Sequence, residues 1–76
     1  MYLSHNNMLT MLSQQSKTTI NEINNLPVCN LLNPTWLTVN YGNSKLYIIR
    51  FGQTTWSIYT KRKKFLNSFT NNHLPA

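Results

Sequence analysis

The sequence predicts an α+β protein in which two or three short N-terminal helices pack on a three-stranded antiparallel β-meander. Apolar residues recur every three or four positions in the first half of the chain, and they recur with a period of two after residue 34. The only two glycines fall between the period-two segments, where turns are needed. At 76 residues the chain is expected to form one domain, 1–76, with loose ends at 1–7 and 70–76.

The helices are predicted from apolar faces and from one capping pattern. Four residues at spacings of three and four predict the first helix: Met8, Leu9, Met11 and Leu12. Thr19 and Glu22 have the spacing of a capping box, so the second helix is expected to begin at Thr19 and to carry Ile20, Ile23 and Leu26 on its apolar side.

Pro27 leaves two options for the segment that follows. It either ends the second helix or starts a further helical turn that ends before Pro34. That further turn would carry three apolar residues: Val28, Leu31 and Leu32.

The second half predicts strands at 35–41, 45–51 and 54–60, joined by two-residue turns at Gly42-Asn43 and Gly52-Gln53. With loops of that length, Trp36 lies opposite Ile49, and Ile49 lies opposite Trp56. The same sheet face then carries Tyr47, Phe51 and Ile58. The other face carries Leu37, Val39, Tyr41, Leu46, Ile48 and Tyr59.

Both faces of this predicted sheet are apolar, although a three-stranded sheet normally leaves one face polar and wet. The N-terminal helices can cover one face. The basic C-terminal segment has Phe65, Leu66 and Phe69 at helical spacing, so a helix over the second face is one option. The other option is an exposed apolar patch that binds a partner.

The charge is strongly one-sided. The sequence contains seven Lys and Arg residues but a single acidic residue, Glu22, which gives a net charge of +6. Lys17 is the only basic residue before Lys45, so the positive charge is concentrated in the second half. This imbalance indicates an anionic partner.

The candidate anion-binding residues are Lys45, Arg50, Lys61, Arg62, Lys63 and Lys64. The last four are consecutive, and at a helix start they would meet the positive end of the helix dipole. We therefore expect this run in a loop or extension, where it can contact nucleic-acid phosphates with salt-sensitive affinity. The alternatives are a solvated charge run, a nuclear-localisation patch and a membrane-surface contact.

Three aromatic residues are candidate contacts beside these cations: Tyr47, Trp56 and Tyr59. Aromatic rings on a sheet face can form a stacking platform for bases. Rows of this kind are more often core, which is the favoured interpretation for Trp36 and Trp56, whereas the two tyrosines are open to either interpretation.

A single carboxylate argues against most enzymatic chemistry. Catalysis by paired carboxylates, two-metal phosphoryl transfer and an Asp-oriented triad all need further acids. His5, Cys29 and His73 lack metal-ligand spacing, so neither a metal nor a cofactor is expected. A metal-free ribonuclease remains as a third hypothesis, with four candidate residues: Lys45, Arg50, Tyr59 and Lys61.

The leading hypothesis is thus a non-catalytic module that binds DNA or RNA through region 45–64. The alternative is an inhibitor, adaptor or accessory subunit that docks an apolar sheet face on an acidic protein, and a homodimer or larger assembly is also compatible. Cys29 is the only cysteine, which indicates a reducing, cytoplasmic environment, or a nuclear one in a eukaryotic host. We expect neither a targeting signal nor a membrane span.

Overall fold

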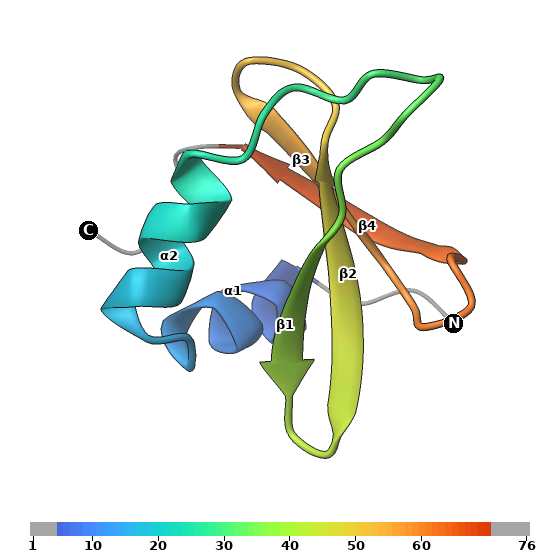
Figure 1. Ribbon diagram of the computed structural model, residues 1–76. Coiled ribbons are helices and arrows are strands. Elements are labelled where there is room, and N and C mark those ends of the chain that lie inside the picture. The colour runs from blue at the N-terminus through green and yellow to red at the C-terminus, as the bar shows by residue number, and fades with distance from the viewer. Residues whose placement is uncertain (1–4, 71–76) are drawn as a thin grey trace.

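The protein has an α+β architecture, shown in Figure 1 as a computed structural model that describes residues 5–70. Two helices, α1 (His5–Ser13) and α2 (Lys17–Asn24), precede the sheet. The strands are β1 (Leu37–Tyr41), β2 (Ser44–Arg50), β3 (Thr55–Tyr59) and β4 (Phe65–Thr70). They form one antiparallel sheet in the order β1-β2-β3-β4. The fold class and the meander are confirmed, but the predicted number of strands was one too low.

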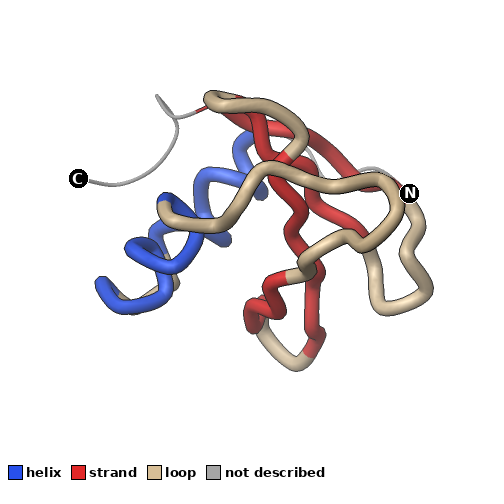
Figure 2. The backbone as a smooth tube through the Cα atoms, turned by 45° about the horizontal axis from the view of Figure 1, so that its top comes forward, coloured by secondary structure: helices blue, strands red, loops and turns tan. Residues whose placement is uncertain are grey.

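Both helices lie on the same side of the sheet (Figures 1 and 2), and the core fills the space between them and the strands. Both helices and all four strands contribute to one cluster of buried side chains. Its members are Met8, Met11, Leu12, Ile20, Ile23, Leu26, Val39, Leu46, Ile48, Trp56, Ile58 and Phe69. The opposite sheet face therefore carries no helix among the described residues.

The predicted apolar face of the first helix is confirmed for Met8, Met11 and Leu12, which are buried, but not for Leu9, which is exposed. Helix α1 begins at His5, so residues 5–7 are helical rather than loose. At the other end, Thr70 is the last residue of β4. The remaining residues that were expected to be loose, 1–4 and 71–76, lie outside the described part of the chain.

The N-cap of helix α2 lies three residues earlier than predicted, since it is Ser16 and not Thr19. Ser16 has an extended backbone, and its hydroxyl accepts a 3.1 Å hydrogen bond from the Thr19 amide. The Ser16 carbonyl then accepts the first helical bond, from the Ile20 amide at 2.9 Å. An extended Ser with this bonding satisfies an amide that the helix itself leaves unpaired.

No further helical turn follows Pro27 within the described chain; residues 25–36 form an irregular loop. Val28 makes an isolated parallel bridge with Arg50, and the Cys29 amide donates to the Arg50 carbonyl at 2.6 Å. The Asn30 side chain accepts from the Leu32 amide at 3.0 Å. Pairing with β2 and this local side-chain bond replace the bonds that a helix would have made.

The C-terminal segment predicted as a possible helix is strand β4. Its Phe69 ring stacks on Trp56 in the core, with ring centroids 5.7 Å apart and planes inclined by 7°. Six residues gain little as an isolated helix, whereas pairing along β3 satisfies their backbone groups and covers a sheet edge. The spacing of apolar residues was compatible with a helix, and tertiary pairing decided otherwise.

The first hairpin has the predicted register, with Leu37 opposite Ile48 and a two-residue turn at Gly42, whose φ is 60°. The second hairpin does not have the predicted register. Its loop is one residue longer, because the Phe51 amide donates to the Thr55 carbonyl at 2.9 Å and residues 52–54 form the turn.

Consequently Arg50 lies opposite Trp56, and Ile49 lies opposite Ser57 rather than Trp56. A slip of one residue exchanges the two faces of a strand. Trp56 and Ile58 therefore face the helices together, and Tyr59 joins the face that carries Tyr47.

No helix among residues 5–70 combines the length and the hydrophobicity that crossing a bilayer requires.

Candidate nucleic-acid interface

The run of four basic residues forms the turn between β3 and β4, as the helix-dipole argument predicted. Thr60 organises this turn. Its carbonyl accepts from the Lys63 amide at 2.8 Å, and its amide donates to the Lys64 carbonyl at 2.8 Å. Its hydroxyl accepts from the amides of Arg62 and Lys64 at 3.3 and 3.1 Å. All four basic residues are exposed, so an ordered backbone presents four cations to solvent.

Lys63 has a left-handed backbone conformation, with φ of 64°. Such a residue is common in three-residue hairpin loops, where glycine usually occupies the position because a side chain is strained there. The Lys63 side chain reaches back over the sheet. Its Nζ lies 3.6 Å from the centre of the Tyr47 ring and 4.8 Å from that of Trp36.

Four aromatic residues form a connected group on the sheet face away from the helices, which we call the aromatic cluster: Trp36, Tyr47, Tyr59 and Phe65. The Trp36 ring meets Tyr59 and Tyr47 edge to face, with centroid distances of 5.2 and 6.2 Å. Tyr59 meets Phe65 in the same manner at 5.7 Å. Phe65 is exposed and the other three are half-buried, so these rings keep surface that a ligand can contact.

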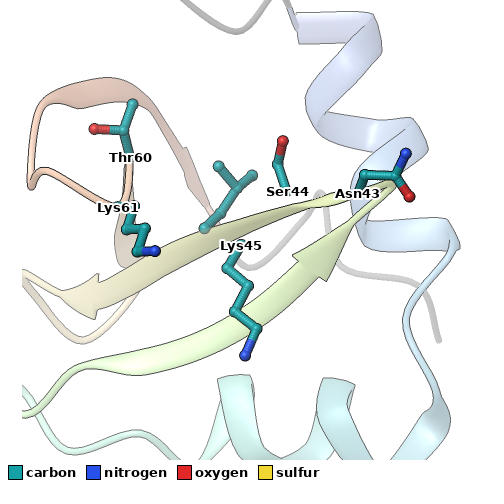
Figure 3. Close-up of a pocket in the computed structure, with 6 residues that line it drawn as sticks. Asn43, Ser44, Lys45, Thr60 and Lys61 are labelled. Carbon is teal, nitrogen blue, oxygen red and sulfur yellow. The ribbon is translucent and has the colours of Figure 1, made fainter.

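Lys45 and Lys61 lie together at an open pocket of about 550 Å³ between the β1–β2 turn and the end of β3. Figure 3 shows both lysines with Thr60, Ser44 and Asn43 around this pocket, which Leu46 completes. Each of these ammonium, hydroxyl and amide groups can donate hydrogen bonds to an anion, although the Lys45 and Ser44 side chains extend to opposite sides of β2 (Figure 3). The structure thus brings together two basic residues that are sixteen positions apart in the sequence.

Arg50 is the remaining basic residue of the predicted set, and it does not line this pocket. Its guanidinium makes hydrogen bonds within the protein. Its three nitrogens donate to backbone carbonyls of Leu26, Gly52 and Gln53. Its Cζ also lies 4.8 Å from the centre of the Trp56 ring. Arg50 therefore connects three segments of the fold, and these contacts leave it poorly available to a ligand.

Trp56 is a core residue, which agrees with the interpretation favoured for it from the sequence. Its side chain is 1% exposed, and its indole Nε1 donates a 2.8 Å hydrogen bond to the Ile23 carbonyl. A ring in this position presents no face to a base. Tyr47 and Tyr59 remain as the predicted aromatic contacts.

Sequence reasoning missed two members of the aromatic cluster. Trp36 was interpreted as core, although it lies just before β1 and outside the core cluster. Phe65 was considered only as part of a possible covering helix. The missing signal was the register of the second hairpin, which places Tyr59 beside Trp36.

Among residues 5–70 no group of three or more His, Cys, Asp or Glu side chains could hold a metal ion. Comparison of the chain with protein-family models, with curated proteins and with solved structures found no match. The chemistry of this surface is therefore the basis for the functional argument.

Proposed function

We propose that this protein is a small, non-catalytic module that binds the phosphates of nucleic acid through its exposed cations. Five exposed basic residues support the proposal: Lys45, Lys61, Arg62, Lys63 and Lys64. They occupy the strand β2 start and the β3–β4 turn, and the aromatic cluster lies beside them. The observation that carries the proposal is this concentration of five of the seven Lys and Arg residues around neighbouring segments.

The only acidic residue does not weaken this surface. Glu22 lies on the exposed side of α2, and α2 packs on the other face of the sheet. The positive potential over the β3–β4 turn is therefore not neutralised locally, and an anionic polymer would be attracted to it. The single cysteine, Cys29, fits a reducing intracellular compartment, which is part of the proposal.

Phosphate binding of this type has a measurable signature. Each neutralised phosphate releases counterions, so five contacts predict a slope of log K against log salt of about −3 to −5. Fluorescence anisotropy with labelled DNA and RNA between about 50 and 200 mM salt measures this slope. Absence of binding to either polymer at the lowest salt concentration would overturn the proposal.

A matched pair of variants separates local contacts from the effect of net charge. Lys61→Ala and Lys17→Ala each remove one positive charge, but Lys17 lies at the start of α2. We expect Lys61→Ala to reduce the salt slope by about one and Lys17→Ala to leave it nearly unchanged. Equal effects of the two variants would show that binding does not use the proposed surface.

The same samples test the non-catalytic part of the proposal. RNA that stays intact in the presence of a metal chelator supports a binding module. Degradation of the RNA would instead favour the metal-free ribonuclease.

A second candidate function, docking on a protein, is favoured by one observation. Leu31 and Leu32 are 84% and 96% exposed in the middle of the loop between α2 and β1. The loop is ordered, because the Asn33 amide donates to the Asn30 carbonyl at 3.0 Å and the Asn30 side chain accepts from Leu32. Two exposed leucines on a hydrogen-bonded turn could insert together into an apolar pocket on another protein.

Size-exclusion chromatography with light scattering and a pulldown from host lysate test this second candidate. We expect nuclease-resistant recovery of a partner protein, and loss of that recovery when Leu31 and Leu32 are both changed to Ser. Nuclease-sensitive recovery that survives the double substitution would favour the nucleic-acid proposal alone.

A further inference from the structure

We propose that the ligand is single-stranded nucleic acid, and that the Lys63 ammonium occupies the position that an unpaired base takes on the Tyr47 ring. The inference rests on the proposed function and specifies the form of the ligand. It follows from three features of the described residues: the backbone of Lys63, the position of its side chain, and the orientation of the rings below it.

The backbone of Lys63 is the first feature. A left-handed residue that is not glycine is uncommon, and strained conformations of this kind persist where the surrounding structure holds them. The turn bonds of Thr60 hold this one, since the Thr60 carbonyl accepts from the Lys63 amide at 2.8 Å. Residue 63 is a lysine in a conformation that suits glycine best. This indicates that the Lys63 side chain has a role at this position.

The side chain is the second feature. Lys63 Nζ lies 3.6 Å from the Tyr47 centroid. This is within the roughly 3.5–4.0 Å at which stacked carbon atoms make contact. Lys63 itself is exposed, so its ammonium can move into solvent without opening the core. A base stacked on an aromatic ring gains more than an ammonium on the same ring at an exposed site. The displaced ammonium can then contact the phosphate of that nucleotide.

The rings are the third feature. Trp36 stands nearly perpendicular to Tyr47, with an interplanar angle of 75°, so the two rings form the floor and the wall of a corner. An unpaired base can stack on one ring while its edge meets the other. Bases in a duplex stack on each other and expose only their edges in the grooves, so they cannot use this corner without being flipped out. Single strands offer free base faces, and proteins commonly recognise these by aromatic stacking.

The fluorescence of the two tryptophans provides the test. Trp36 borders the corner, whereas Trp56 is buried and shielded from ligand. We expect an oligothymidylate of about 12 nucleotides to quench the Trp36 emission and to bind at least about tenfold more tightly than a duplex of equal length at the same salt concentration. The Trp36→Phe variant should lose this quenching and, because Trp36 forms the wall of the corner, should also bind the single strand more weakly.

A pair of tyrosine variants tests the stacking directly. Tyr47→Leu should weaken binding of the single strand by about tenfold and change binding of the duplex much less. Tyr41→Leu is the matched control, because Tyr41 packs against the core cluster on the helix side of the sheet. It should affect neither ligand. Circular dichroism establishes that each variant is folded. The quenching of Trp36 is measured on the original protein, so that part of the test does not depend on any variant folding.

The possible outcomes separate this inference from the proposed function. Salt-dependent binding in which the duplex binds as tightly as the single strand, with unchanged Trp36 emission, would overturn the inference and leave the phosphate-binding proposal standing. No binding of either ligand at low salt would overturn both. Preferential binding of the single strand with Trp36 quenching supports both.

Discussion

Arg50 Nη1 donates a 2.9 Å hydrogen bond to the carbonyl oxygen of Leu26, which joins the end of the helical half to the sheet. The same guanidinium donates to the carbonyls of Gly52 and Gln53 in the β2–β3 loop. The Arg50 carbonyl accepts from the Cys29 amide. This one residue therefore holds together the β2–β3 loop and the loop that follows α2.

Replacing Arg50 with lysine should lower the free energy of unfolding by about 2–3 kcal/mol, because an ammonium cannot make the three planar contacts of a guanidinium. Urea denaturation measures the change. Arg62→Lys is the matched control, since Arg62 is exposed in the β3–β4 turn, and it should stay within about 0.5 kcal/mol of the original protein. Similar values for the two variants would contradict the bonding role of Arg50.

Lys63→Gly should raise the free energy of unfolding by about 1 kcal/mol. It removes the left-handed strain of a side-chain-bearing residue, which is partly offset by the greater freedom of glycine in the unfolded chain. The same variant should bind nucleic acid more weakly, because it lacks one cation. Lys64→Gly provides the comparison: Lys64 is not left-handed, so it should lose binding without gaining stability. A less stable Lys63→Gly protein would refute the strain argument.

Ser16→Ala should lower the free energy of unfolding by about 1 kcal/mol, because the Thr19 amide at the start of α2 loses its acceptor. Thermal unfolding followed by circular dichroism measures this effect. Thr18→Ala in the same helix should be neutral or slightly stabilising, since alanine favours the helix. If Ser16→Ala is also neutral, the cap assigned to α2 is incorrect.

Trp56→Phe should cost about 2 kcal/mol, because it removes the indole bond to the Ile23 carbonyl and leaves a space in the core beside Phe69. Trp36→Phe is the matched substitution on the opposite sheet face, where the indole makes no such bond to any residue in 5–70, and it should cost less than about 1 kcal/mol. Denaturant titration of the two variants gives both values. The reverse order would contradict the assignment of the two faces.

Much of the fold follows from local signals in the sequence. The apolar face of α1 predicts a helix, and the Gly42-Asn43 pair predicts the first turn and its register, because both depend on neighbouring residues. The basic run was also placed correctly in a turn, by the argument that four cations disfavour a helix start. These signals need no knowledge of distant contacts.

The predictions from sequence were wrong at two places where contacts between distant residues determine the local structure. Gly52 is compatible with either a two-residue or a three-residue loop, and only pairing of Phe51 with Thr55 selects the longer one. The helical spacing of Phe65 and Phe69 is equally compatible with a strand, and the free edge of β3 selects the strand. In both places the local sequence allowed two structures with similar local free energies.

The candidate site shows the same division. The sequence by itself determined the charge, the aromatic content, the meander and the exposure of the basic turn, since these depend on composition and on short-range pattern. Only the tertiary structure decided that Trp56 lies on the opposite sheet face from Trp36, that Arg50 is used for internal bonds, and that Lys63 lies over Tyr47. The physical reason is that a shift of one residue in the second hairpin reverses every side chain of β3, and burial of the whole sheet face against the helices selects that register.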